Sequence, residues 1–303
     1  MADSRSSSCT LVLLSSVVLL AGAFPAFAQA PPDEPAVTVR GQTYTPRSIL
    51  SRNMGTDEDQ TTAFPPHKIV GNVYYVGTRT LSSFLITTPA GHILLNSTYE
   101  RNVRTIEKSV TQLGFKFADV RILLGTHAHG DHQEGDALVK ELTKAQVMAM
   151  REDVPALEAI RPGGKAHPID RTLRDGEEVT LGGTTLVAHL TAGHTRGCTT
   201  WTMKTQEGGK TLDVVFACSY RSPATVTPDI EKEFSRTFTL VRSLPCDVPL
   251  GDHPAQYNMA AKHARLKPNA PNPFIDPANC WVEAEIQEAM LRAQLKMQQA
   301  AKP

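Results

Sequence analysis

The chain of 303 residues has no excess of charge of either sign, because 31 Lys and Arg residues balance 31 Asp and Glu residues. Proteins that bind nucleic acid usually carry a basic excess, so we expect no nucleic-acid partner. No segment repeats with a period of about 20–50 residues, which argues against a repeat architecture. The length and the 41% hydrophobic content are typical of a globular protein with one or two domains.

The chain also has no apolar run that would span a bilayer comfortably. Residues 9–24 are apolar, follow Arg5 and lead into small residues up to Ala28 and Ala30. This order is typical of a cleaved secretory signal, which we assign to residues 1–28, with an uncleaved anchor helix as the alternative. We therefore expect a periplasmic protein that does not contact the membrane once the signal is removed.

Cysteines are few, and Cys9 would leave with the signal. The even number that remains in an exported chain favours disulfides. The four cysteines of the mature chain are Cys198, Cys218, Cys246 and Cys280.

The rest of the chain divides at about residue 67. Residues 29–66 are rich in Pro, Thr, Asp and Gln, which predicts a loosely ordered N-terminal arm. From there, strand patterns and helix patterns follow one another in two rounds, with no linker between the rounds. Clear cases are a helix over 97–114, a strand over 120–126 and a helix over 227–244 that begins at Thr227. Residues 67–303 are thus predicted to form one α+β domain, with two packed β-sheets and helices on the outer faces.

Four metal-binding side chains lie within six positions, directly after the apolar strand over 120–126. Alternate side chains of an extended segment point the same way, so neighbouring residues can serve different metal ions. Imidazole and carboxylate ligands suit zinc best, with iron or manganese as lesser options. The four residues are His127, His129, Asp131 and His132.

Two further histidines, His194 and His253, also follow predicted strands. His127, His129 and His194 would form a three-histidine zinc site with an open position, as in catalytic zinc sites. Asp131, His132 and His253 would form a second site beside it. A water shared by two such ions loses a proton near neutral pH and becomes a nucleophile. We expect ordinary roles for the other histidines, which are His67, His92, His167, His189 and His263.

Three motifs carry a resemblance to a known family: "THAHGDH" at 126–132, "GHTRGCTTW" at 193–201 and "GDH" at 251–253. With them the chain resembles the metallo-β-lactamase superfamily, and most of all the third subclass of true metallo-β-lactamases. The resemblance implies an αββα sandwich and two zinc ions per chain. It also implies that a metal-bound hydroxide opens the ring of penicillins, cephalosporins and carbapenems. Asp131 would orient this nucleophile and handle its proton, and we expect a monomer.

The same resemblance bears on residues around the cluster. Ser219 stands where glyoxalase II and lactonase-like relatives have an Asp that bridges the metals, which favours the lactamase interpretation. Ser219, Arg221 and Ser222 are candidates for binding the substrate, with a solvated loop charge as the alternative for Arg221. Asn96 stands where many relatives have an Asp that supports the cluster, so we expect it to affect metal affinity or rate.

The resemblance also guides the pairing of the cysteines. Another lactamase subclass uses a cysteine near Cys218 as a zinc ligand, so a ligating thiol is an alternative. We favour a Cys198–Cys218 disulfide, because the two residues flank a predicted hairpin symmetrically about Gly208. Cys246–Cys280 is then the other pair, and it resembles a bond of this subclass.

Two other functions remain open. One is a related di-zinc hydrolase of lactones, thioesters or other esters. The other is a zinc-binding protein without catalysis.

Overall fold

The structure is a computed structural model that describes Met1 and residues 34–301, so all but the first residue of the expected signal peptide lies outside the described residues. The helices and strands belong to a unit that spans Pro35–Pro303. In the described part of the chain, no helix is long and apolar enough to cross a membrane.

The larger sheet has seven strands in sequence order, β3 to β9. Its first four strands pair antiparallel and its last four parallel, with β6 shared by both parts. Parallel strands pack best when both faces are covered, which agrees with the mostly apolar sequences of β6, β7 and β8. The strands are β3 (His67–Val70), β4 (Val73–Tyr75), β5 (Phe84–Thr88), β6 (Gly91–Leu95), β7 (Val120–Leu124), β8 (Gln146–Met150) and β9 (Arg171–Leu173).

The smaller sheet has five strands in the order β10 to β14, and only its last pair is parallel. Gly208 and Gly209 turn β12 into β13, both with positive φ, 57° and 77°. A two-residue hairpin turn of this type needs positive φ at both positions, which glycine adopts without strain. The strands are β10 (Glu178–Leu181), β11 (Thr184–Leu190), β12 (Thr199–Glu207), β13 (Lys210–Ala217) and β14 (Val248–Gly251).

The main core lies between the two sheets. Phe84 and Ile86 of β5 face this core with Trp201 of β12, whereas Leu85 faces the other side of its sheet and packs with Val103 of α2. This alternation follows from the period of two in a strand. Burial of apolar surface on both faces is the main force that stabilises the layers.

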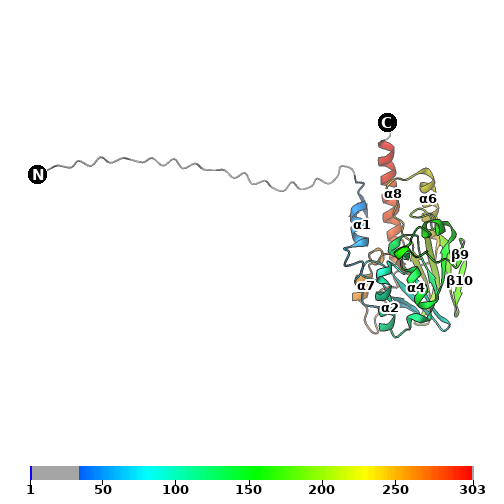
Figure 1. Ribbon diagram of the computed structural model, residues 1–303. Coiled ribbons are helices and arrows are strands. Elements are labelled where there is room, and N and C mark those ends of the chain that lie inside the picture. The colour runs from blue at the N-terminus through cyan, green and yellow to red at the C-terminus, as the bar shows by residue number, and fades with distance from the viewer. Residues whose placement is uncertain (2–33, 302–303) are drawn as a thin grey trace. The chain divides into compact units, whose positions relative to one another are not determined.

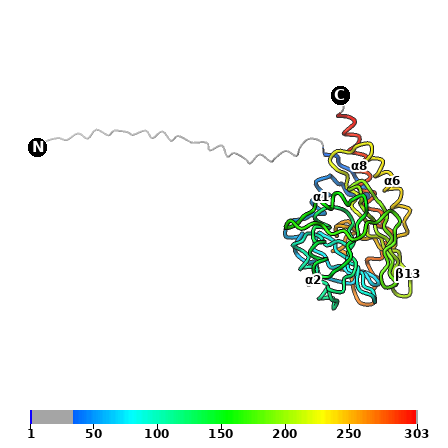
Figure 2. The backbone as a smooth tube through the Cα atoms, turned by 45° about the vertical axis from the view of Figure 1, so that its right-hand side comes forward, coloured from blue at the N-terminus to red at the C-terminus, as the bar shows by residue number. Residues whose placement is uncertain are grey.

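Helices cover the outer faces, with α2 and α4 packed on the larger sheet and α6 and α8 packed together beside the end of β13. Figure 1 labels all four helices, and Figure 2 shows α2 apart from α6 and α8. The α-helices are α1 (Pro46–Met54), α2 (Val103–Gln112), α3 (Gly130–Gln133), α4 (Asp136–Thr143), α5 (Val154–Leu157), α6 (Pro228–Ser243), α7 (Met259–Ala264) and α8 (Val282–Ala300). The 3-10 helices are η1 (Glu100–Asn102), η2 (Phe117–Asp119), η3 (Arg151–Asp153), η4 (Pro162–Gly164), η5 (Pro254–Tyr257) and η6 (Pro277–Asn279). The layers are those of the expected αββα sandwich.

The described part of the segment 29–66 differs from the loosely ordered arm that we expected. Residues 37–44 form a hairpin of β1 (Val37–Val39) and β2 (Gln42–Tyr44), and α1 follows with a capping box at Thr45. Figure 1 shows α1 beside α8, where Arg52 donates to both oxygens of Glu283. The composition of the segment did not predict these elements, because the two strands have only three residues each. Their stability comes from contacts with α8, which is distant in the sequence.

Candidate metal centre

Three strand-end loops carry the histidines and the aspartate that the sequence singled out. The loop after β7 holds His127 and leads through His129 into the short helix α3, which contains Asp131 and His132. His194 follows β11, and His253 lies two residues after the end of β14. Since β7 belongs to one sheet and the other two strands to the second, the six side chains meet where both sheets end.

The first group consists of His127, His129 and His194. Their ring centroids form a nearly equilateral triangle with sides of 4.8, 4.7 and 4.8 Å. One nitrogen of each ring lies within 4.8 Å of the others, which is close enough for one metal ion to bind all three. The sequence prediction brought together the same three side chains.

The second group consists of Asp131, His132 and His253, and it directly adjoins the first. Oδ2 of Asp131 lies 3.1 Å from Nε2 of His132 and 3.9 Å from Nε2 of His253. The rings of His127 and His132 are only 4.3 Å apart between centroids, so the two groups share a border. Ligand atoms of this group also lie within 4.8 Å of one another.

Backbone carbonyls fix the orientation of two of these rings. Nδ1 of His194 lies 2.7 Å from the carbonyl oxygen of Arg221, and Nδ1 of His253 lies 3.0 Å from that of Thr80. A carbonyl oxygen only accepts hydrogen bonds, so each Nδ1 carries the proton and Nε2 keeps its lone pair. Both rings therefore offer Nε2 to the group in which they lie.

The donor set fits a metal ion. Burial lowers the pKa of His253 to about 4 and holds that of His194 well below its usual range, so both are neutral at pH 7 and free to act as ligands. Burial alone would lower the pKa of His132, but the carboxylates of Asp131 and Asp252 outweigh it and raise the pKa. Nδ1 of His132 is buried without a hydrogen-bond partner. Imidazole nitrogens beside a carboxylate are ligands that zinc binds readily.

A pocket of about 180 Å³ opens onto both groups. Ser219 and Arg221 line it, as expected of residues that bind a substrate, but Ser222 does not, because its hydroxyl donates to Oε1 of Gln294 on α8. The remaining wall is formed by Tyr99 and by residues of α1 that the sequence analysis left in the arm, Leu50, Asn53 and Met54.

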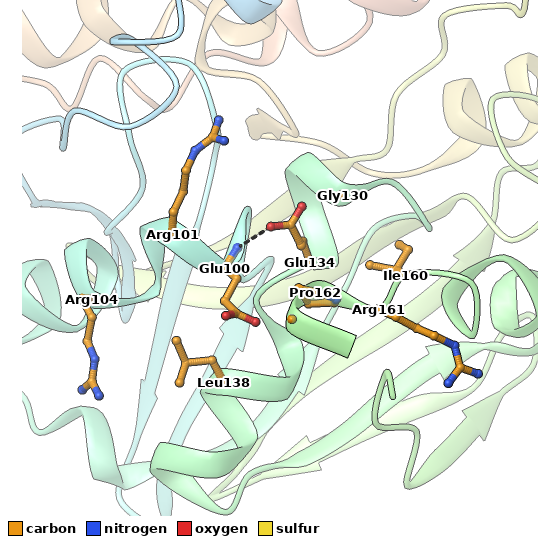
Figure 3. Close-up of a pocket in the computed structure, with 10 residues that line it drawn as sticks. Glu100, Arg101, Arg104, Gly130, Glu134, Leu138, Ile160, Arg161 and Pro162 are labelled. Carbon is orange, nitrogen blue, oxygen red and sulfur yellow. Dashed lines mark hydrogen bonds between the residues drawn. The ribbon is translucent and has the colours of Figure 1, made fainter. Parts of the chain in front are cut away.

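A second, larger hollow of about 860 Å³ lies nearby, between η1, α3 and the loop at Pro162 (Figure 3). Arg101, Arg104 and Arg161 stand around it, and Figure 3 shows that their guanidinium groups point away from one another. The arginines therefore do not converge on a common ligand position.

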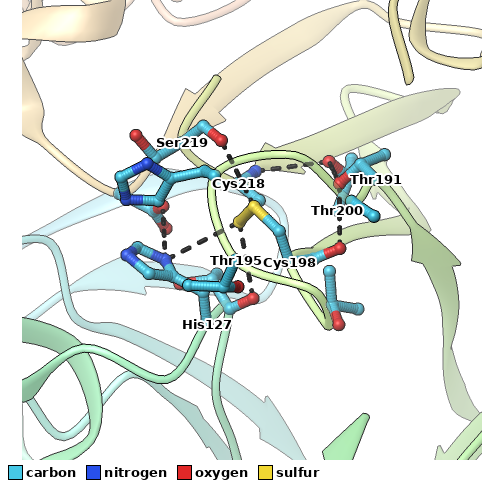
Figure 4. Close-up of a disulfide and its surroundings, with 12 residues drawn as sticks. His127, Thr191, Thr195, Cys198, Thr200, Cys218 and Ser219 are labelled. Carbon is cyan, nitrogen blue, oxygen red and sulfur yellow. Dashed lines mark hydrogen bonds and ion pairs between the residues drawn. A yellow bond between two sulfur atoms is a disulfide. The ribbon is translucent and has the colours of Figure 1, made fainter. Parts of the chain in front are cut away.

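Both predicted disulfides are present. Cys198 and Cys218 are bonded with a Cα–Cα distance of 6.0 Å, and Cys246 and Cys280 with 6.2 Å. The sulfur of Cys218 lies 3.6 Å from Nδ1 of His127 (Figure 4), yet a sulfur held in a disulfide offers no thiolate to a metal. This excludes the alternative of Cys218 as a ligand while the bond is intact.

Asp252 is a buried site residue that the sequence analysis missed. Its Oδ2 lies 3.2 Å from Nδ1 of His127, and its Oδ1 lies 3.5 Å from Nδ2 of Asn96. Asn96 in turn accepts hydrogen bonds from the backbone and the hydroxyl of Thr126. The available signal was the position of Asp252 directly before His253 in "GDH".

The fold combines two packed mixed sheets with a metal-binding site of histidines and aspartate at the ends of their strands. This combination defines a class of metal-dependent hydrolase folds. Residues 76–206 match the model of the metallo-β-lactamase superfamily. The FEZ-1 metallo-β-lactamase of Legionella gormanii is 40% identical over 79% of this chain and 98% of its own, with a TM-score of 0.74. The chain therefore belongs to the metallo-β-lactamase superfamily.

Other relatives agree on the subclass. BJP-1, a subclass B3 metallo-β-lactamase of Bradyrhizobium japonicum, is 37% identical over 80% of this chain and 98% of its own, with a TM-score of 0.75. LRA-12, a class B3 di-zinc metallo-β-lactamase from an Alaskan soil metagenome, is 27% identical over 79% of this chain and 97% of its own, with a TM-score of 0.72. The structural neighbours of this chain are thus subclass B3 metallo-β-lactamases.

A hydroxyacylglutathione hydrolase of Hyphomonas neptunium also matches, at 36% identity over 92 residues. The match spans 30% of this chain and only 32% of that enzyme.

Proposed function

We propose that this chain is an exported β-lactamase that holds two zinc ions and hydrolyses the amide bond of the β-lactam ring. The observation that carries the proposal is the pair of adjoining ligand groups, His127 with His129 and His194, and Asp131 with His132 and His253. The 40% identity to FEZ-1 over nearly all of that enzyme supports the choice of substrate class.

Zinc, when bound, would polarise the substrate carbonyl and make a water nucleophilic near neutral pH. The residues of the chain would supply the geometry. Asp131 has a carboxylate oxygen close to both His132 and His253, so it can hold the attacking water in line and take up its proton. Burial alone would raise the pKa of Asp131, but His132 outweighs burial and keeps the pKa well below its usual range, so Asp131 is ionised.

The substrate carboxylate would meet Arg221 and Ser219. Both line the pocket, and Arg221 is already fixed at its carbonyl oxygen by the bond from His194. An arginine can bind a carboxylate with two parallel hydrogen bonds. Because the hydroxyl of Ser222 is bonded to Gln294, we no longer assign Ser222 to this role.

A thioester or lactone hydrolase is the second candidate, favoured by the partial match to a hydroxyacylglutathione hydrolase. Ser219 argues against it, because a serine offers no carboxylate to bridge two ions. We also propose that the protein is a periplasmic monomer. The two disulfides are consistent with an oxidising compartment.

The test uses the mature chain purified with zinc. We expect two zinc ions per chain, turnover of carbapenem and cephalosporin substrates, and loss of that turnover when a chelator removes the metal. His129→Ala should retain the fold, lose about one zinc ion and lose most turnover, because one of three ligands is gone. Faster turnover of lactones or thioesters than of any β-lactam would favour the second candidate, and zinc binding without turnover of either would indicate a binding protein.

A further inference from the structure

A buried carboxylate outside the two ligand groups joins the loops that carry the three histidines. Asp153 is the last residue of η3, the 3-10 helix that directly follows β8. Only 2% of Asp153 is exposed. In the described part of the chain no lysine or arginine forms an ion pair with it. A buried charge without a countercharge needs strong hydrogen bonds to be stable.

Three hydrogen bonds reach this carboxylate from two different loops. Oδ2 of Asp153 accepts from the backbone N–H of Ala128 and from the hydroxyl of Thr195, both at 2.8 Å, and Oδ1 accepts from the backbone N–H of Gly197 at 2.7 Å. Ala128 lies between His127 and His129, and Thr195 directly follows His194. The carboxylate thus holds the direct sequence neighbours of all three histidines.

The chemistry of the contacts requires an acceptor-only group. All three partners donate, and an ionised carboxylate accepts on both oxygens. An amide in its place would turn an N–H₂ group toward at least one backbone N–H. Gly197 is part of the same arrangement, because a Cβ atom there would lie 2.5 Å from the backbone nitrogen of Asp153 and 2.6 Å from its Cβ.

We propose that Asp153 is a positioning residue that sets the geometry of the three-histidine group for its metal ion. The proposal rests on the proposed function only in that this group binds a metal. Asp153 donates nothing to and accepts nothing from Asp131, His132 or His253. We therefore expect its effect to be largest at the three-histidine position.

The test measures zinc affinity by competition with a chromophoric chelator, for the full mature chain and for Asp153→Asn. Loss of a group that orients metal ligands typically weakens metal binding by about 10–100-fold. We expect a loss of this size for one zinc ion and an unchanged affinity for the other. The gain in Tm on addition of zinc should shrink accordingly, since ligand binding to the native state stabilises it by mass action.

Asp170→Asn is the matched control. Asp170 accepts the backbone N–H of Val147 at 2.9 Å, at the end of β8 that lies away from Asp153. This variant should lower the Tm of the metal-free protein without changing either zinc affinity. The proposal is wrong if Asp153→Asn behaves like Asp170→Asn, with a lower Tm and both affinities retained.

Two further variants keep the test decisive if Asp153→Asn does not fold. Thr195→Val removes one of the three hydrogen bonds, and Gly197→Ala forces the same loop away from Asp153. Both variants should bind the same zinc ion more weakly than the wild-type chain does. Unchanged zinc affinity in both would overturn the proposal. A wild-type chain that binds two zinc ions and hydrolyses no β-lactam would contradict the proposed function but leave this inference intact.

Discussion

Nδ1 of His127 lies 3.2 Å from Oδ2 of Asp252, and both side chains are almost completely buried. A carboxylate beside Nδ1 keeps the proton on that nitrogen, so Nε2 is left as the ligand atom. Burial alone would raise the pKa of Asp252, but His132 and His127 outweigh burial and lower it. Asp252 is therefore ionised and acts on the metal centre through His127.

Asp252→Asn should reduce zinc affinity and kcat/KM by about 10–100-fold, because an amide can present N–H₂ to Nδ1 and favour the wrong tautomer. Zinc titration and steady-state kinetics measure both quantities. Asp213→Asn is the control, since Asp213 pairs with Lys204 on the surface. Wild-type values in Asp252→Asn would show that the contact with His127 is not needed.

Asn96→Asp should weaken zinc binding or slow turnover at pH 7. The substitution places a second carboxylate about where Nδ2 of Asn96 now lies, 3.5 Å from Oδ1 of Asp252 in a fully buried site. Two carboxylates at this distance cannot both ionise without a large cost. The variant should recover part of its stability in acid, where one carboxylate is protonated, as thermal unfolding from pH 5 to 8 would reveal. Equal zinc affinity and rate in the two proteins would contradict this prediction.

The Cys246–Cys280 bond should contribute about 3–4 kcal/mol to the free energy of unfolding, from the loop entropy that it removes from the unfolded chain. It closes a separation of 34 residues and ties the chain before β14 to the start of α8. Denaturant unfolding of the double variant Cys246→Ala, Cys280→Ala measures the loss. Turnover at 25 °C should persist, because neither cysteine lines the pocket.

His67 should make stability fall as the pH drops from about 6.5 to 4. Burial lowers the pKa of His67 to about 4, so over this range the unfolded chain binds a proton that the folded chain does not. Stability is thus complete above about pH 6.5, and the loss by pH 4 is about 3 kcal/mol.

His67→Phe keeps the ring contacts with Tyr75 and Phe274 but cannot be protonated. Comparing the two metal-free proteins cancels the titration of the other histidines. The difference in unfolding free energy between the wild-type chain and His67→Phe should change by about 3 kcal/mol between pH 7 and pH 4. A difference that does not change with pH would show that burial does not lower the pKa of His67.

Local sequence signals predicted the elements that depend on local chemistry. Thr227 caps α6 as expected, with its hydroxyl oxygen accepting from the backbone N–H of Ile230. The predicted helix over 97–114 begins later, at Val103, because distant contacts take the expected caps. Ser97 donates to Asp136, and Thr98 has a positive φ of 59°. Tertiary contacts decided this boundary against the local pattern.

The sequence by itself determined the two ligand groups, the disulfide partners and the two-sheet architecture. The spacing in "THAHGDH" indicated four of the six ligands, and the symmetry about Gly208 indicated the Cys198–Cys218 pair. The alternating strand and helix patterns indicated the architecture. Only the tertiary structure decided that α1 lines the pocket, that Ser222 turns away from it, and that Asp153 and Asp252 support the histidines. The role of such a carboxylate is not written in its local sequence, because its partners come from loops far apart in the chain and meet only when both sheets are packed.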